Sequence, residues 1–399
     1  MSWNAHDWVN QGGRLLATNP ALAQRLIEKG ITLDPYEPIS WFNLGIGLHQ
    51  QRKIRAAIKA YQHCLALPHT TDVGIAALNN LSQDLLLQGE WKLGWTHYNQ
   101  RFRRKPGNYP IFENAFGPAH TAVPSVDRPV LLMSEQGLGD TLQFVRYALA
   151  LQNKGIDVTV LSQPPLVELL RDEIGLRQVV DHLDLAEQQK HNPLWMPLMN
   201  LAPLMGCIND KIPYRSGYAK ADPEAIYKWQ QRLQRKPNHR LIALHWQGNP
   251  EHEQSLYSRG RSMRFQEWHG LKSKDRIEFV SIQKGQASEQ LKTDQGLHFV
   301  SGQEAVSKSM DFRETSAVIA NCDLVITSDS CVAHLAGAMG IPTWLALRWI
   351  PEWRWGLEGS NTAWYSSLRL FRQSFDGNWA SVVQAMQQEL THIPLRSLD

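Results

Sequence analysis

Residues 129–144 read PVLLMSEQGLGDTLQF, the pattern of a strand, a turn and the start of a helix. The apolar run at 129–133 has the length of a buried parallel strand, and Gly137 and Gly139 allow a tight turn into a helix. Such a turn places the Asp140 carboxylate at the carboxyl edge of a sheet, where ligands bind in α/β folds. Helix capping explains Asp140 equally well, so both interpretations stay open. The stretch lacks the third glycine of a dinucleotide fingerprint and the Lys-Ser/Thr of a P-loop, which argues against dehydrogenases and nucleotide hydrolases.

Further short apolar and β-branched runs alternate with helical stretches along the chain. They lie at 157–161, 241–245, 278–282, 323–327 and 342–347. This alternation predicts α/β layers built on parallel strands. Charges and prolines between 207 and 240 divide the region. We therefore expect two Rossmann-like half-domains, 115–235 and 236–375, followed by a C-terminal helix within 376–399.

A second strand–turn–helix pattern occupies residues 323–343, DLVITSDSCVAHLAGAMGIPT. The turn at Asp329, Ser330 and Cys331 offers backbone N–H groups and a helix dipole to a diphosphate. Asp329 cannot bind phosphate itself, but it can accept hydrogen bonds from sugar hydroxyls. For His334, ligand binding and ordinary packing one turn into a buried helix both remain open.

The first 110 residues are predicted to be helical. Asn19 and Pro20 form an N-cap and first-turn pair. The segment from Trp41 to Leu48, followed by Ala57, Tyr61 and Cys64, fits the tetratricopeptide pattern, and Ala23 to Ala57 spans the 34-residue period of that repeat. Residues 1–110 therefore resemble two and a half to three tetratricopeptide repeats, of which the middle one matches closely.

Composition narrows the function classes. Forty-one Lys and Arg against 38 Asp and Glu leave a charge of +3, which gives no electrostatic footprint for nucleic acid. Four cysteines without a C-x-x-C pair fit a reducing cytoplasm, and we expect neither a signal peptide nor a membrane span. His63, Cys64 and His69 cluster in sequence, but helical spacing separates the histidines, so no metal site is expected.

Fifteen tryptophans are an excess for a chain of 399 residues. The segment 348–355 alone contains three of them, RWIPEWRW. These rings either wall a nucleotide site by stacking or fill a core.

The two strand–turn–helix motifs, in this order and spacing, resemble the family 9 glycosyltransferases. These are the bacterial heptosyltransferase-like group, and the likeness is closer to bacterial tetratricopeptide proteins that carry such a domain. The resemblance implies a GT-B fold, in which a nucleotide-sugar lies between two Rossmann-like halves and no metal is required. It further implies that Asp140 is the general base and that the turn at 329–331 holds sugar and diphosphate. Smaller family-like pieces are WQGN at 246–249, Arg261-Ser262, SIQKG at 281–285, Asp311-Phe312 and WRW at 353–355.

One departure from that family concerns the diphosphate. Heptosyltransferases place a lysine after the first strand of the second half, whereas the loop 249–262 offers Arg259 and Arg261. A guanidinium binds phosphate bidentately, so Arg261 is the candidate, with a solvated loop charge as the alternative for both. Gln283 and Lys284 end a strand at the same edge; a surface lysine explains Lys284 equally well. The expected donor-binding residues are Gly137, Gly139, Arg261, Gln283, Lys284, Asp329, Ser330, Cys331 and His334.

The sequence thus predicts a metal-independent inverting glycosyltransferase without a cofactor beyond its nucleotide-sugar co-substrate. The transferred group is a hexose or heptose, and the acceptor is a hydroxyl of a protein, glycan or lipid, docked by residues 1–110. Two alternatives are a nucleotide-sugar 2-epimerase and a non-catalytic tetratricopeptide scaffold with a degenerate GT-B domain. The repeats argue against the epimerase, and Asp140, Asp329 and His334 together argue against the scaffold.

Overall fold

The computed structural model describes residues 3–99, 101, 109–206, 211–271, 276–293, 296–374 and 377–390. It separates into two compact units. The helical unit comprises Met1–Ile111 together with two distant segments, Ser255–Tyr257 and Ile350–Glu358, and the α/β unit comprises the remainder.

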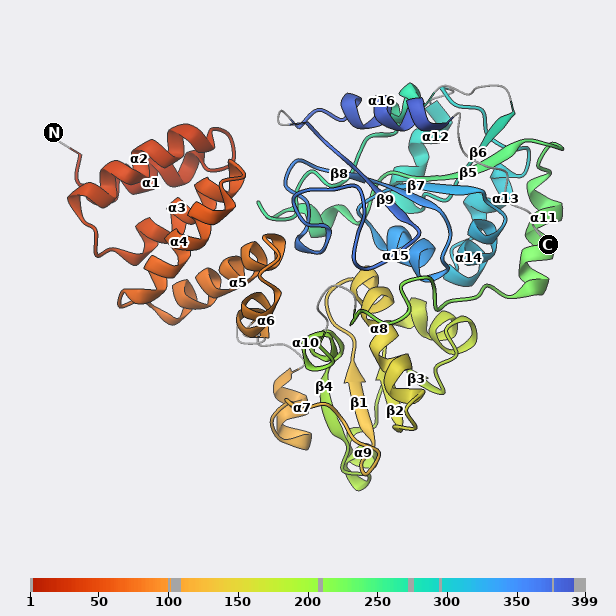
Figure 1. The fold of residues 1–399 in the computed structure, drawn as a ribbon, viewed down its shortest axis with the longest axis horizontal. Coiled ribbons are helices and arrows are strands. Elements are labelled where there is room, and N and C mark those ends of the chain that lie inside the picture. Colours follow the sequence, from red (N-terminus) through yellow and green to blue (C-terminus); the bar gives the residue numbers. More distant parts are fainter. Residues whose placement is uncertain are drawn as a thin grey trace. The chain divides into compact units, whose positions relative to one another are not determined.

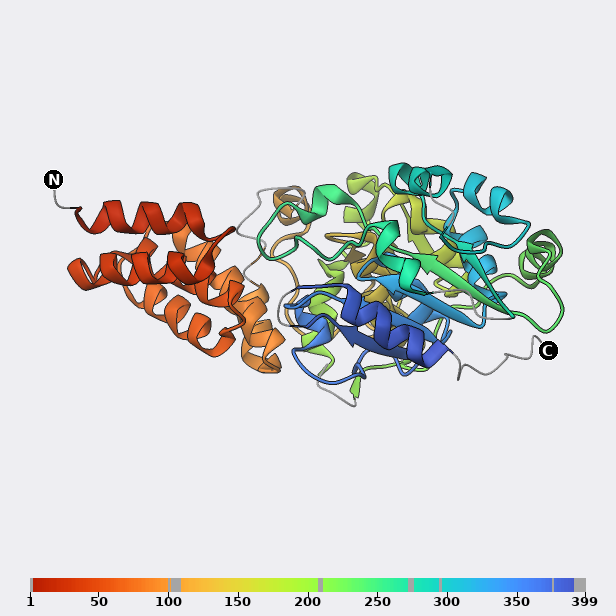
Figure 2. The ribbon, with the colours of Figure 1, turned by 90° about the horizontal axis from the view of Figure 1, so that it is seen from above.

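Consecutive helices of the helical unit pack in pairs (Figures 1 and 2). Asn19 caps the second helix by accepting a hydrogen bond of 3.1 Å from the Leu22 N–H, and Pro20 occupies the first turn, as expected. Ala23 and Ala57 are fully buried at the helix contacts. The helical pairs are confirmed, while their assignment to tetratricopeptide repeats stays a prediction. The pairs are α1 (Ala5–Leu15) with α2 (Pro20–Leu33), α3 (Pro38–Gln50) with α4 (Ile54–Ala66), and α5 (Thr71–Leu87) with α6 (Trp91–Tyr98).

The α/β unit starts within α7 (Tyr109–Phe116), at Phe112, and contains a parallel four-stranded sheet of order β3-β2-β1-β4. Its elements are β1 (Val130–Met133), α8 (Leu138–Gln152), β2 (Val158–Leu161), β3 (Gln178–Val180), α9 (Leu185–Lys190), β4 (Leu194–Pro197) and α10 (Leu201–Leu204). The strand order reverses beside β1. Such switch points are where ligands bind at the carboxyl ends of open α/β sheets.

A second parallel sheet has the order β6-β5-β7-β8-β9, so its switch point lies between β5 and β7. Its strands are β5 (Arg240–His245), β6 (Ile277–Ser281), β7 (Leu324–Ser328), β8 (Thr343–Leu347) and β9 (Leu368–Arg372). The helices are α11 (Pro223–Leu233), α12 (Gln290–Thr293), α13 (Gln303–Lys308), α14 (Phe312–Ala320), α15 (Cys331–Ala338) and α16 (Ala380–Glu389). Trp246, Trp268 and Phe279 fill the core on one face of this sheet, together with apolar residues of α16.

Every strand expected from the sequence is present, as β1, β2, β5, β6, β7 and β8, and two parallel sheets confirm the α/β prediction. The sequence analysis missed β3, β4 and β9. The expected C-terminal helix is α16, and residues 375–376 and 391–399 lie outside the described part of the chain.

Candidate functional site

The amino ends of α8 and α15 meet within the α/β unit (Figure 1), which brings the two strand–turn–helix motifs together. A β-carbon added at Gly139 would lie 2.9 Å from Cδ2 of His334 and 3.3 Å from Cα of Cys331. Glycine alone permits so close an approach. Because α8 follows β1 and α15 follows β7, the carboxyl edges of both sheets contribute to one place, where a ligand site is expected.

Asp140 lies in the first turn of α8 and is half-buried. Its Oδ2 accepts a hydrogen bond of 2.9 Å from the Gly137 backbone N–H, so the carboxylate caps the helix. A carboxylate offers about four acceptor positions. Capping and proton transfer, which the sequence left as alternatives, are therefore compatible in this one residue.

The turn from β7 into α15 is held by hydroxyl groups around a buried histidine. Ser330 caps α15, and its hydroxyl contacts Nδ1 of His245 at 3.2 Å and the hydroxyl of Thr327 at 3.3 Å. Burial lowers the pKa of His245 to about 3, and the charge of Lys284 acts in the same direction. The imidazole is consequently neutral at physiological pH, and it is a hydrogen-bond partner of the Ser330 hydroxyl.

Asp329 directly follows β7. The residue is only 6% exposed, and within the described part of the chain its side chain forms no hydrogen bond or ion pair. A carboxylate is an acceptor of hydrogen bonds. Asp329 can therefore accept hydrogen bonds from a ligand that donates them, such as a sugar with vicinal hydroxyls.

Arg261 lies close enough to Cys331 to affect its titration. Burial raises the pKa of the Cys331 thiol to about 11, while the charge of Arg261 opposes that rise. The thiol is therefore neutral, and we expect no nucleophilic role for it. The Nε of Arg261 lies 3.7 Å from Glu253 Oε1, which fixes the guanidinium beside the first turn of α15.

Gln283 and Lys284 follow β6 at the same sheet edge but differ in their surroundings. The Gln283 side chain accepts hydrogen bonds from the backbone N–H groups of Trp246 and Gln247 at 3.0 and 2.9 Å, and it donates to the Gln247 carbonyl at 2.9 Å. The Gln283 amide therefore holds the backbone of the loop after β5 by hydrogen bonds. Lys284 donates to the Val306 carbonyl, and burial lowers its pKa to about 8.

His334 is buried behind Gly139, and its Nδ1 lies 3.0 Å from the hydroxyl of Tyr365. Arg146 is fully buried with its guanidinium over the ring of Tyr365, and it donates to the Trp364 carbonyl at 2.7 Å. The buried ring and its contact with Tyr365 agree with ordinary packing, and a ligand-binding role for His334 stays a prediction.

Part of the candidate site lies in a segment that matches the sequence model of a known protein family. Residues 279–346 match the sequence model of Glycosyltransferase family 9 (heptosyltransferase). The family 9 segment contains Gln283, Lys284 and the complete 323–343 motif. Asp140, its two glycines and Arg261 lie outside it.

One curated relative aligns over more of the chain. Protein FlbA of Caulobacter vibrioides is 23% identical over 318 residues, and the alignment spans 74% of this chain and 51% of that protein. This chain therefore spans about half the length of the curated relative that it matches.

Two solved structures resemble the chain at low identity. The Escherichia coli ADP-heptose LPS heptosyltransferase II has 12% identity and a TM-score of 0.43, and the match covers 66% of this chain and 98% of that one. The family 9 glycosyltransferase of Veillonella parvula has 10% identity and a TM-score of 0.48, with coverages of 68% and 97%.

Tryptophans near the family 9 segment contribute packing. Trp353 and Trp355 are 3% and 2% exposed. The ring of Trp353 contacts Trp95 and Tyr98 within the helical unit, at centroid distances of 5.4 and 6.0 Å. Core filling, which was one of the two explanations for these tryptophans, accounts for Trp353.

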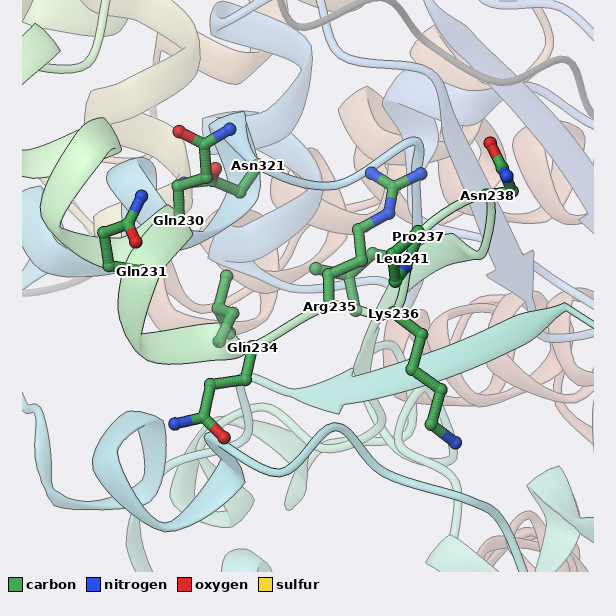
Figure 3. A pocket seen from close by; sticks show the side chains of 10 residues that line it. Gln230, Gln231, Gln234, Arg235, Lys236, Pro237, Asn238, Leu241 and Asn321 are labelled. Carbon is green, nitrogen blue, oxygen red and sulfur yellow. The ribbon is translucent and has the colours of Figure 1, made fainter.

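A polar cavity of about 580 Å³ lies between α11 and the start of β5 (Figure 3). Gln230, Gln234 and Lys236 line it, and Arg235 beside them pairs with Asp323 at 2.7 Å. This cavity opens at the amino end of β5, the opposite end from His245, so it is separate from the candidate site.

Among the residues that the structure describes, no group of three or more His, Cys, Asp and Glu side chains is suited to hold a metal ion. Within those same ranges, no helix combines the length and apolar character that crossing a bilayer requires.

His245 and the Tyr365–Arg146 pair were missed by sequence reasoning. His245 ends an expected strand at the carboxyl edge, which was the available signal. Tyr365 and Arg146 carry no local pattern, because their partners lie far away in the sequence.

Proposed function

We propose that this chain is a metal-independent inverting glycosyltransferase that moves a sugar from a nucleotide-sugar to an acceptor hydroxyl. The observation that carries the proposal is the meeting of α8 and α15, in which Gly139, the neighbour of Asp140 in sequence, lies against Cys331. The match of residues 279–346 to glycosyltransferase family 9 supports glycosyl transfer as the reaction class. A GT-B arrangement is the architecture proposed for the two parallel sheets.

The donor would bind at the β5–β7 switch point. Backbone N–H groups at the start of α15 face a diphosphate favourably, and Arg261 and Lys284 add positive charge. Asp329 would accept hydrogen bonds from sugar hydroxyls, which would satisfy its buried carboxylate. In this assignment Gly137 and Gly139 allow the close approach of the two helices, Ser330 and His245 hold the turn, and Gln283 supports the loop after β5.

In the proposed reaction the acceptor oxygen attacks the anomeric carbon while Asp140 takes the hydroxyl proton. The new carbon–oxygen bond forms as the bond to the nucleoside diphosphate breaks, so the anomeric configuration inverts. The leaving diphosphate gains negative charge, which the α15 amino end, Arg261 and Lys284 would stabilise. A hexose and a heptose both fit this scheme.

The test begins with the wild-type chain and a panel of nucleotide-sugars, with release of nucleoside diphosphate as the readout. Asp140→Asn should abolish transfer and leave nucleoside diphosphate binding nearly unchanged. Asp7→Asn is the matched control, because Asp7 makes the same first-turn capping bond in α1, at 3.0 Å. Near-normal turnover in Asp140→Asn would disprove the assignment of the base.

The same assay separates the alternatives. A 2-epimerase would change the sugar configuration in the nucleotide-sugar pool without a sugar transferred to an acceptor. A scaffold would bind partners but release no nucleoside diphosphate with any donor.

The acceptor is proposed to be a protein or glycan docked by residues 1–110. Stacked helical pairs of the tetratricopeptide type commonly present an extended binding surface. The paired helices α1–α6 support this role.

A further inference from the structure

The loop that carries Arg261 has its middle residues in the helical unit. Ser255–Tyr257 group with helices α1–α6, although residues 254 and 258 belong to the α/β unit. Tyr257 precedes Arg261 by four residues, a span of at most about 14 Å in an extended chain. A constraint on Tyr257 therefore limits where Arg261 can lie.

Tyr257 is held by several kinds of contact. Its ring stacks on His49 with centroids 3.9 Å apart and an interplanar angle of 24°. Its hydroxyl shares a hydrogen bond of 2.7 Å with the hydroxyl of Tyr61. The carbonyl of neighbouring Leu256 accepts a hydrogen bond of 3.1 Å from Gln50.

Tyr257 contacts a buried cluster of polar side chains that belong to α3, α4 and α5. His49 Nδ1 lies 2.7 Å from Asp84 Oδ1, and Asn80 donates to the Tyr61 hydroxyl at 3.4 Å. Tyr61 and Asp84 are fully buried. Burying such groups costs folding free energy unless they are hydrogen-bonded, and Tyr257 supplies one of the required partners.

The base of the loop is closed within the α/β unit. The Gly248 N–H donates to the Ser262 hydroxyl at 3.1 Å, and the Ser262 N–H donates to Glu253 at 3.2 Å. Glu253 also pairs with Arg261. The loop is thus held at two places, at Tyr257 by the helical unit and at Glu253 by its contacts with Ser262 and Arg261.

A second loop is anchored in the same way, which is an independent observation. It follows β8, and its Trp353 packs on Trp95, while Arg52 donates to the Leu357 carbonyl at 2.6 Å. The loop after β5 and the loop after β8 thus each contribute a segment to the helical unit, Ser255–Tyr257 and Ile350–Glu358. Arg348 links the two loops by donating to the Arg259 carbonyl at 2.9 Å.

We propose that Tyr257 is a positioning residue through which the helical unit sets the conformation of loop 249–262 and so presents Arg261 to the donor diphosphate. The inference rests on the proposed donor site. It gives the helical unit a role in donor binding that does not depend on the acceptor.

Two readouts test it on the full chain. Hydrogen exchange of peptides covering 249–262 reports capture of the loop without any nucleotide, and calorimetry with nucleoside diphosphates reports the donor site. Tyr257→Ala should speed exchange in these peptides and raise Kd about tenfold, with donor KM raised more than kcat is lowered. Tyr257→Phe, which keeps the stacking and loses one hydrogen bond, should raise Kd about threefold. Tyr227→Ala, at a tyrosine 65% exposed on α11, is the matched control and should change neither readout.

The outcomes distinguish three claims: that the helical unit holds the loop, that this positions Arg261, and that the donor site exists. Faster exchange with weaker nucleoside diphosphate binding supports the proposal, whereas wild-type exchange in a folded Tyr257→Ala variant overturns loop capture. Faster exchange with an unchanged Kd overturns the positioning of Arg261. If Tyr257→Ala does not fold, Tyr257→Phe and Tyr61→Phe decide by the same criteria. A wild-type chain that binds no nucleoside diphosphate disproves the proposed donor site, and the positioning role falls with it even where exchange shows the loop held.

Discussion

Arg261 and Lys284 are the two proposed diphosphate ligands, and their surroundings differ. Guanidinium groups stay charged in proteins, and the Nε of Arg261 lies 3.7 Å from Glu253 Oε1. Lys284 is partly buried, and its lowered pKa of about 8 makes its charge depend on pH. The two residues therefore predict different pH responses.

Nucleoside diphosphate affinity should fall as the pH rises through about 8, because Lys284 loses its proton there. The terminal phosphate has already ionised, with a pKa near about 6, so it adds little above pH 7. Calorimetry at pH 7 and pH 9 measures the effect. Lys284→Arg should remove the pH dependence, and an equal loss of affinity in Lys284→Met at both values would contradict the prediction.

Arg261→Ala should weaken nucleoside diphosphate binding at all pH values by about 1.5–3 kcal/mol, the usual range for a hydrogen bond to a charged group. Arg264→Ala is the control, because Arg264 lies in the same segment with a side chain that is 79% exposed. Equal affinities for the two variants would place the diphosphate elsewhere.

The polar residues at the strand ends could be predicted from the sequence, but the contacts that each of them makes could not. Asp140, Asp329 and Ser330 stand where a strand–turn–helix pattern puts them, because that geometry is local. Gln283 stands there too, yet its amide is used by the backbone of Trp246 and Gln247, which only the packed structure reveals. His245 belongs to the same edge, and only its distance to Ser330 marks it out.

At the scale of elements, the contact between α8 and α15 depends on one glycine. Gly139→Ala should force the helices apart, since the new β-carbon would lie 2.9 Å from His334 and 3.3 Å from the Cys331 backbone. We expect a loss of about 1–3 kcal/mol in unfolding free energy and a larger loss of transfer, measured by denaturant unfolding and turnover. In Gly13→Ala, the matched helical control, the nearest atom is 3.8 Å away, and stability should be kept or increased. A fully active Gly139→Ala variant would contradict the importance of this contact.

Glu173 connects the segment Leu169–Glu173 to α14 through a hydrogen bond of 2.8 Å from the Ser316 hydroxyl. Burial raises the pKa of Glu173 from 4.5 to about 7, although the Ser316 bond and the charge of Arg313 oppose the rise. The folded state therefore holds a proton that the unfolded state releases. The contribution of Glu173 to stability is present below about pH 4.5 and is lost as the pH rises to about 7.

Glu173→Gln should be more stable than the wild type above pH 7, by about 1–3 kcal/mol, and equally stable near pH 4.5, because the amide stays neutral. Urea unfolding at several pH values measures the difference between the two proteins. Glu168→Gln, at an exposed neighbouring carboxyl group, should show no such pH-dependent gain. A constant difference across the pH range would contradict the assignment.

The strands that the sequence predicted are apolar or β-branched runs, and all of them except β6 lie inside their sheets. The three missed strands all lie at sheet edges: β3 has only three residues, β4 ends in proline, and β9 has two arginines among its five residues. Edge strands need less apolar surface than central ones, so their sequences resemble loops.

At the scale of the whole molecule, the helical unit is completed by residues from far along the chain. Tyr61 and Tyr257 are 196 positions apart, and no sequence period or local motif connects them. The helical pairs follow from amphipathic spacing, but the place of Ser255–Tyr257 and Ile350–Glu358 follows from tertiary packing alone. A chain lacking residues 1–105 would leave Tyr257 and Trp353 without their packing partners.

Deleting residues 1–105 should therefore destabilise the remaining chain and lower donor hydrolysis and transfer together, so it cannot isolate acceptor docking. A point substitution can do so. Leu33 and Tyr36 are apolar and 58% and 77% exposed at the junction of α2 and α3, where they support no core. Changing both to Ser should leave donor hydrolysis at the wild-type rate and lower transfer about tenfold, the size of effect that loss of an apolar anchor produces. The control is Val126→Ser with Tyr227→Ser, two equally exposed apolar residues of the α/β unit. Hydrolysis and transfer that stay coupled in both double variants would show that this end of the helical unit does not dock the acceptor. A selective loss of transfer in the first variant would separate acceptor docking from the donor-positioning role of Tyr257.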